Sequence, residues 1–181
     1  MKNNTKMLVL SALFTALACV ATMIIKIPIP GSFGYIHPGD VVVILAGIIL
    51  GPVHGFFAAG IGSALADLLN GYSIYAPVTF VIKGFVALCG AHIYRLMIRK
   101  SKKLSIFLCA LVNMIFVVGG YFGFESILYQ VPTALISISA NLIQTGCGMI
   151  LTFVLYPAIT AIPEIKQMLY MKYGNHAECK R

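Results

Sequence analysis

Long apolar blocks recur along this sequence and limit what the chain can fold into. Of its 181 residues, 60% are hydrophobic and only 10% are charged, whereas a soluble domain carries roughly 25% charged residues. The net charge of +8 would suit nucleic-acid binding, but the basic residues punctuate the apolar blocks instead of forming one patch. The sequence therefore predicts an all-α integral membrane protein. It excludes an ordinary cytosolic enzyme, a disordered chain and a nucleic-acid-binding module.

Six membrane helices are expected, because one helical span needs about 20 mostly apolar residues. The apolar stretches are Met7–Ile25, Val41–Leu69 with the turn signal Gly51-Pro52 inside it, Pro77–Met97, Leu104–Phe124 and Thr133–Ile162. The part before the turn, Val41–Leu50, is too short to cross alone at about 1.5 Å per residue. It is either a short span or half of a re-entrant hairpin, and we predict a short second helix. The helices form a membrane domain of residues 1–162, followed by a tail of residues 163–181.

The basic residues predict the orientation of these helices. Eleven of the 13 lysines and arginines lie in segments that alternate topology places on one side of the membrane. They are Lys2, Lys6, Arg95, Arg99, Lys100, Lys102, Lys103, Lys166, Lys172, Lys180 and Arg181. By the positive-inside rule that side is the cytoplasm, so we predict that both termini and the tail are cytoplasmic.

Sequence signatures of catalysis and metal binding are missing. The chain has no Walker A, HExxH or GxSxG sequence. Its five cysteines show no CxxC spacing, and four of them lie in apolar blocks, where a free cysteine behaves as a small hydrophobic residue. The four histidines show no metal-ligand spacing. We predict that the protein is not an enzyme and holds no metal or cofactor.

Polar residues within the predicted spans gather near the outer leaflet on this topology. Ionisable groups inside a membrane are costly and usually face the protein interior, so each is a candidate functional residue. The set is Asp67, Lys83, Glu125, Asn141 and Gln144, with Tyr75 and Tyr121 at the rim. Their similar depth indicates a small-molecule pocket that opens outward. The alternative is structural: Asp67 and Lys83 form an ion pair that joins two helices, and the amides only bond neighbouring helices.

Two further patterns concern helix ends and helix contacts. Asp40, next to Pro38-Gly39, is expected to cap the second helix as its N-cap residue. Ala12 and Ala16 lie four residues apart on the first helix. Small residues at this spacing let helix backbones approach closely in lipid. For this pair, packing within the chain and docking of another subunit are about equally expected.

A resemblance to a known family rests on two stretches. They are Gly34–Leu69, which reads GYIHPGDVVVILAGIILGPVHGFFAAGIGSALADLL, and Tyr75–Phe85, which reads YAPVTFVIKGF. Both are similar to the substrate-binding S component of energy-coupling factor (ECF) vitamin importers, and most to its riboflavin-type branch. The resemblance extends over the whole chain in length and in the number of helices.

The resemblance implies a six-helix protein of the bacterial plasma membrane that captures a vitamin from outside, with its first outer loop closing over the ligand. It also implies docking on a transmembrane T component with two ATPases, which hydrolyse the ATP. The family's docking surface is an Ala-xxx-Ala pair in the first helix, which Ala12 and Ala16 match. The implied ligands are of pyridoxine, hydroxymethylpyrimidine or riboflavin type. The chain has no tryptophan, unlike the pockets of thiamine-binding relatives.

Two other functions remain open from the residues alone. One is a secondary transporter that works without partners and is coupled to protons through Asp67 or Glu125. Such a protein is expected to carry internal repeats, and the two halves of this sequence show no convincing duplication. The other is a membrane assembly protein without a ligand, in which the polar residues only join helices.

Overall fold

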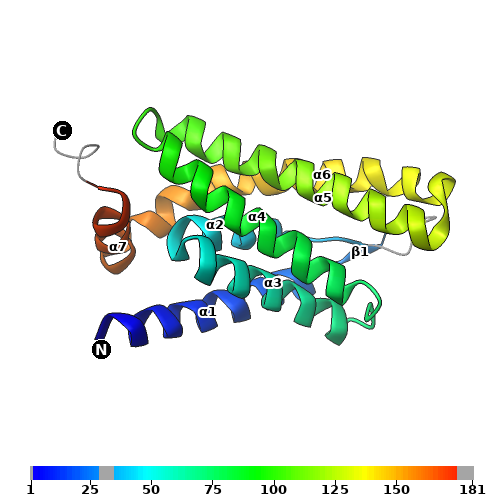
Figure 1. Ribbon diagram of the computed structural model, residues 1–181, viewed down its shortest axis with the longest axis horizontal. Helices are drawn as coiled ribbons and strands as arrows, with labels where there is room; N and C mark the ends of the chain where they lie inside the picture. Colours follow the sequence, from blue (N-terminus) through cyan, green and yellow to red (C-terminus); the bar gives the residue numbers. More distant parts are fainter. Residues whose placement is uncertain (1, 29–34, 175–181) are drawn as a thin grey trace.

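The computed structural model describes residues 2–28 and 35–174, and side chains from residue 4 onward. In these ranges the chain forms seven helices and one two-stranded hairpin (Figure 1). The helices are α1 (Lys2–Ile24), α2 (Asp40–Leu50), α3 (Pro52–Leu69), α4 (Ala76–Met97), α5 (Lys102–Tyr129), α6 (Val131–Thr160) and α7 (Pro163–Tyr173). The strands β1 (Ile27–Pro28) and β2 (Tyr35–Ile36) pair antiparallel, with Ile27 opposite Ile36.

The helices confirm the all-α membrane architecture. Five of them, α1, α3, α4, α5 and α6, are long and apolar enough to cross a bilayer. The short second helix is also present, and its 11 residues extend about 16 Å, roughly half of a hydrocarbon core. The number of six crossings therefore stays a prediction.

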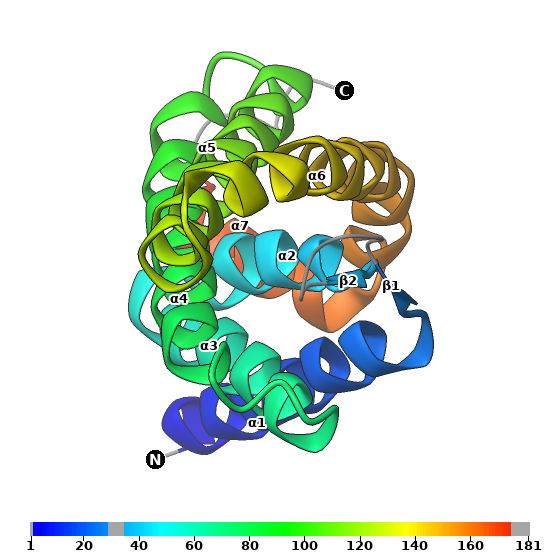
Figure 2. The same ribbon diagram turned by 90° about the vertical axis from the view of Figure 1, so that its right-hand side faces the viewer.

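The short helix α2 lies at the centre of the molecule. Viewed along the bundle, α1, α3, α4, α5 and α6 surround it (Figure 2). All 11 of its residues are buried, which explains why its sequence is an unbroken apolar run after Asp40. Gly47 is required by the close approach of α4, because a Cβ atom there would lie 2.4 Å from the carbonyl oxygen of Ala87. Gly51, with φ of 83°, turns the chain between α2 and α3.

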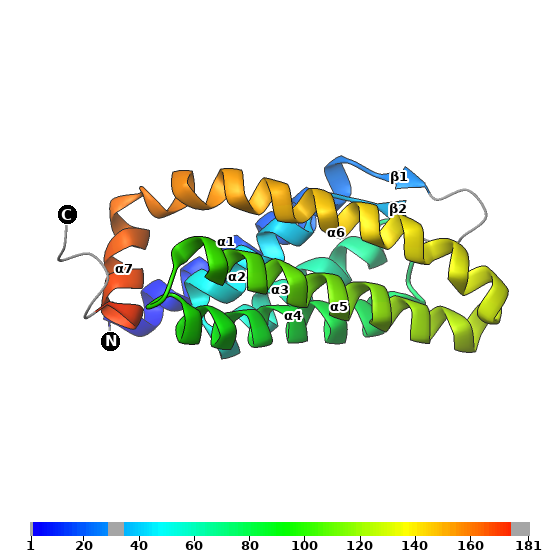
Figure 3. The same cartoon turned by 90° about the horizontal axis from the view of Figure 1, so that it is seen from above.

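The bundle has two different ends, which Figure 3 shows from above. The start of α1, the α4–α5 connection and α7 lie at one end, which we call the terminal end. The β hairpin, the α3–α4 connection and the α5–α6 connection lie toward the other, which we call the hairpin end. The structure thus brings together the described basic segments on which the orientation was predicted, while Lys180 and Arg181 lie outside the described residues. The side of the membrane that each end faces stays a prediction of the positive-inside rule.

The tail that follows the membrane domain begins with a packed helix that the sequence analysis did not anticipate. Ile165 and Met168 of α7 are buried against the bundle. Lys172 donates a 2.5 Å hydrogen bond from Nζ to the carbonyl oxygen of Leu50, and the Tyr173 hydroxyl donates to that of Ile48 at 3.1 Å. Helix α7 therefore satisfies carbonyl groups at the C-terminal end of α2 that have no partner within that helix.

Candidate ligand-binding site

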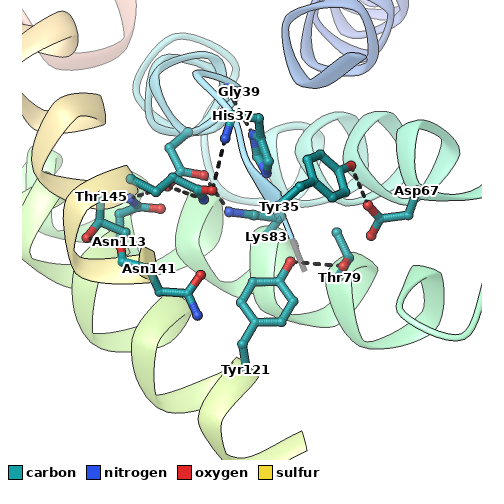
Figure 4. Close-up of polar contacts among 12 residues, drawn as sticks. Tyr35, His37, Gly39, Asp67, Thr79, Lys83, Asn113, Tyr121, Asn141 and Thr145 are labelled. Atoms are coloured by element: carbon teal, nitrogen blue, oxygen red, sulfur yellow. Dashed lines mark hydrogen bonds and ion pairs between the residues drawn. The ribbon is translucent and has the colours of Figure 1, made fainter. Parts of the chain in front are cut away.

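A buried ion pair lies between the start of α2 and the middle of α4. Lys83 and Asp40 are in contact through Nζ and Oδ1, and both side chains are 0% exposed. The second carboxylate oxygen of Asp40 accepts hydrogen bonds from Asn113 of α5 at 3.1 Å and Gln144 of α6 at 3.2 Å. A charge in an apolar interior needs such partners. Four helices therefore meet at one polar network (Figure 4).

The hairpin is attached to this network on the side toward the hairpin end. The backbone N–H of His37 donates to Gln144 Oε1 at 3.1 Å, so one amide binds both Asp40 and the segment after β2. His37 Nδ1 accepts from the backbone N–H of Gly39 at 3.1 Å. Burial, followed by the positive charge of Lys83, lowers the pKa of His37 to about 4. His37 is therefore neutral near pH 7.

A small polar cavity lies beside the network, toward the hairpin end. Its lining comes from the hairpin segment and from α3, α4, α5 and α6, and comprises Tyr35, His37, Asp67, Tyr72, Tyr75, Thr79, Tyr121, Glu125, Asn141 and Gln144. Its volume is about 40 Å³, which is room for roughly three water molecules. A heteroaromatic ring can enter only if the lining side chains move apart.

Hydroxyl groups hold the two carboxylates of the cavity lining. The Tyr35 hydroxyl donates to Asp67 Oδ1 at 2.7 Å, which joins the hairpin to the end of α3. Glu125 accepts from the Tyr75 hydroxyl at 3.2 Å and from the Ser137 hydroxyl. Both carboxylates are nearly buried, with Asp67 5% and Glu125 3% exposed.

Asn141 differs from the other amides of the site. Its side chain is 7% exposed and lines the cavity. In Figure 4 its side-chain amide points toward Tyr121 and no hydrogen bond joins that amide to another residue drawn there, whereas its backbone carbonyl oxygen accepts from the Thr145 hydroxyl at 2.8 Å. Within the described part of the chain no hydrogen bond is formed by its side-chain amide, which reaches the cavity and is not one of the fully buried polar groups without a partner; those are Thr22 Oγ1, Ser63 Oγ and Asn113 Oδ1. Tyr121, in contrast, is bonded to Thr79, with 2.9 Å between the hydroxyl oxygens.

The structure brings together the polar residues that the sequence singled out. Asp67, Tyr75, Tyr121, Glu125, Asn141 and Gln144 all line the cavity. Lys83 lies outside the lining and is paired with Asp40, with its Nζ 5.8 Å from the centre of the Tyr121 ring. The structural alternative, an ion pair between Asp67 and Lys83, is therefore wrong in its partner, since Lys83 pairs with Asp40. Glu125, near the end of α5, is buried within this lining.

Asp40 is the residue that sequence reasoning misplaced. Helix α2 begins at Asp40 itself, its N-cap residue is Gly39, and no side chain caps it. The Asp40 carboxylate turns instead toward α4, α5 and α6. One signal could have indicated this: Asp40 begins a fully apolar run, as Lys83 interrupts another, and two opposite charges at such positions need a partner.

The two alanines of the predicted docking pair lie on the outside of the bundle. Ala12 and Ala16 are exposed, whereas Phe14 and Ala18 of the same helix are buried. The contact of α1 with α3 uses this other face, since a Cβ atom on Gly62 would lie 2.4 Å from the Thr15 carbonyl oxygen and 2.8 Å from Ala18 Cβ. The structure thus leaves both Ala12 and Ala16 exposed on the surface of α1.

The fold and the cavity define a multi-pass helical membrane protein with a polar site near one end of its bundle. The chain belongs to the ECF-type riboflavin transporter S component family, whose model matches residues 2–161. This is a family of transporter components and not a class of enzymes. The match covers the helices that form the cavity and ends before α7.

Two relatives extend this finding. The thiamine precursor transporter HmpT of Lactococcus lactis subsp. cremoris (strain MG1363) is 32% identical over 158 residues, which are 86% of this chain and 89% of that protein. A protein of Pyrococcus woesei described as an uncharacterized protein in the gap 3′ region is 51% identical over 65 residues. That match covers 36% of this chain, and this chain spans less than half of the relative's length, at 43%.

Proposed function

We propose that this protein is the substrate-specific binding subunit of an ECF-type vitamin importer and that its cavity takes a vitamin precursor of hydroxymethylpyrimidine type. Pyridoxine and riboflavin are the other ligands to test. The observation that carries the proposal is the Asn141 amide, which is nearly buried, lines the cavity and has no protein partner in the described chain. A bound ligand would supply the hydrogen bonds that this amide lacks. The similarity to HmpT supports the choice of ligand.

The environment of the cavity suits a small heteroaromatic ring. Four tyrosines line it, and their rings offer faces and edges for stacking. The Asn141 amide and the two carboxylates are polar groups at separate points of the wall, which can fix the orientation of a ring. Because the volume is small, we propose that the hairpin and its Tyr35–Asp67 bond are displaced when the ligand enters.

The partners follow from the same proposal. We propose that the hairpin end faces outward, that the terminal end faces the cytoplasm, and that the protein lies in the cell membrane. The exposed face of Ala12 and Ala16 then docks on the T component, which carries two ATPases. Support comes from the exposure of both alanines: small residues at this spacing allow close approach of another helix, and in the described chain this surface of α1 is exposed. The S component itself needs no cofactor in this scheme, because its partners hydrolyse ATP.

Binding to the purified protein tests this proposal. Isothermal titration in detergent with hydroxymethylpyrimidine, pyridoxine and riboflavin is expected to show saturable binding of one of them. Asn141→Ala is expected to weaken that binding about ten-fold or more, since one lost hydrogen bond leaves a polar ligand group unpaired at roughly 1–3 kcal/mol. The matched control is Gln167→Ala, which removes an amide that is exposed on α7, outside the cavity lining. An Asn141→Ala variant that binds as tightly as the unaltered protein would contradict the assigned site.

A further inference from the structure

The charges around the cavity are not balanced. Asp67 and Glu125 both line it. In the described residues the only salt bridge is the one between Lys83 and Asp40, so neither carboxylate of the lining has a cationic partner there. The nearest lysine side chain at the hairpin end, Lys26, donates instead to Asn70 Oδ1 at 2.8 Å on the exposed surface.

Hydroxyl groups surround the two carboxyl groups and leave part of their hydrogen-bonding capacity unused. An ionised carboxylate only accepts, and it has about four acceptor positions on its two oxygens. Asp67 accepts from the Tyr35 hydroxyl, and Glu125 accepts from those of Tyr75 and Ser137. The Ser137 hydroxyl also contacts the carbonyl oxygen of Ala134 at 2.8 Å, so its single proton is shared between two acceptors, and each carboxyl group keeps acceptor positions for a ligand.

The two basic groups nearest to the cavity do not offset this charge. Lys83 is fully buried against Asp40, so that pair is neutral as a unit. His37 lines the cavity, but it is neutral near pH 7 because burial and Lys83 lower its pKa to about 4. The wall that a ligand meets therefore presents two carboxyl groups without a cationic partner in the described residues, beside several neutral donors and acceptors.

From these contacts we propose that the cavity selects heteroaromatic compounds that bring N–H donors or a positive charge, and that Asp67 and Glu125 make it reject the phosphate esters of the same compounds. This inference rests on the proposed function, since it concerns the same site. An amino group or a protonated ring nitrogen can donate to the free acceptor positions of a carboxylate. A phosphate ester brings up to two negative charges toward two others in a poorly hydrated site, where like charges repel strongly.

Paired titrations test the inference. The probes are hydroxymethylpyrimidine and its monophosphate, and pyridoxine and its monophosphate, each titrated into the purified protein. For whichever parent compound binds, the monophosphate is expected to bind about 100-fold more weakly or worse, because it meets two carboxylates at close range. This comparison needs no variant and so does not depend on the folding of one.

Variants that remove one carboxyl group each then test whether Asp67 and Glu125 cause the selection against phosphate esters. Asp67→Asn and Glu125→Gln keep the side-chain shape and each remove one charge. Each variant is expected to bind the parent compound more weakly. Each is also expected to reduce the ratio between the affinities for the parent compound and its monophosphate to about ten-fold, since roughly half of the repulsion is removed. Glu164→Gln is the matched control, because Glu164 is exposed on α7 at the terminal end. It is expected to change neither affinity.

Each outcome decides a separate point. Equal binding of a parent compound and its phosphate overturns the charge selection and leaves the proposed function standing. Discrimination that persists unchanged in both Asp67→Asn and Glu125→Gln overturns the assignment to these residues. Failure of hydroxymethylpyrimidine, pyridoxine and riboflavin to bind the folded protein contradicts the proposed function, and the selection with it.

Discussion

Replacement of Lys83 by methionine tests whether the buried network holds the bundle together. The change keeps an unbranched side chain of similar length and removes only the charge. It leaves the Asp40 carboxylate with the amide donors of Asn113 and Gln144 and without a cation. Because the side chain of Asp40 is 0% exposed, water cannot take the place of the lysine.

The expected loss of stability follows from this burial. Removing one partner of a buried ion pair costs about 3–5 kcal/mol. For a chain of this size, such a loss lowers the melting temperature by about 10 °C. The double variant Asp40→Asn/Lys83→Met is expected to recover most of the loss, since replacing both members of a buried pair is often neutral. Lys26→Met is the control, because Lys26 is exposed and its hydrogen bond to Asn70 lies at the surface.

Thermal unfolding of the detergent-solubilised proteins, followed by circular dichroism, measures these differences. The order of stability expected is Lys26→Met close to the unaltered protein, the double variant slightly below it, and Lys83→Met well below both. A Lys83→Met variant that melts together with Lys26→Met would refute the argument that this pair stabilises the fold. A double variant as unstable as Lys83→Met would show that the loss comes from packing and not from the unpaired charge.

Four further predictions concern other parts of the molecule. Gly47→Ala is expected to cost about 1–3 kcal/mol in thermal unfolding, because its Cβ would meet the Ala87 carbonyl oxygen at 2.4 Å; Gly119→Ala, where a Cβ meets nothing within 4 Å, is expected to be neutral or stabilising. The pKa of His37 in the folded protein, about 4, lies below its value in the unfolded chain, so the free energy of unfolding is expected to fall by about 2 kcal/mol between pH 7 and pH 5, as the unfolded state gains the proton. His37→Asn should flatten this pH dependence, and an unchanged dependence in the variant would contradict a neutral His37 in the folded protein. Ala12→Leu/Ala16→Leu is expected to abolish uptake by cells while the purified protein still binds ligand, because large side chains push close helices apart; normal uptake would argue against docking on this face. Cysteines introduced at Ser73 and Lys102 are expected to be labelled from outside and from inside respectively, and labelling of Lys102 from outside would reverse the orientation.

The elements of the fold were largely predictable from the sequence. A membrane helix is visible in a single sequence as a run of apolar residues, and the turn at Gly51-Pro52 separates α2 from α3 as expected. Helix α5 continues to Tyr129, five residues past the apolar block. Ile127 and Leu128 of its last turn are exposed, whereas the side chain of Glu125 is buried and contacts the hydroxyl groups of Tyr75 and Ser137. Helix α7 was missed because an 11-residue amphipathic helix has no long apolar run to mark it.

The sequence predicted the depth of the polar side chains in the membrane, but not which of them bond to one another. Position along a helix gives the depth of a side chain, and this was enough to group Asn141 and Gln144 with residues of α3 and α5. The rotation of each helix about its axis decides which side chains meet, and the sequence does not fix it. For this reason Lys83 was placed in the ligand pocket, with a pair to Asp67 as the structural alternative, whereas the central position of α2 pairs it with Asp40, 43 residues away in the chain.

The measurement that tests the central claim most directly is the identification of small molecules that remain bound when the protein is purified from cells. Mass spectrometry of the detergent-solubilised protein is expected to find a heteroaromatic vitamin precursor without a phosphate group, at an amount close to one molecule per chain. The same preparation of Asn141→Ala is expected to contain much less of it, because the amide that faces the cavity is gone. An equal amount of compound in both preparations, or none in the folded unaltered protein when the medium supplies these compounds, would contradict a vitamin-binding cavity at Asn141.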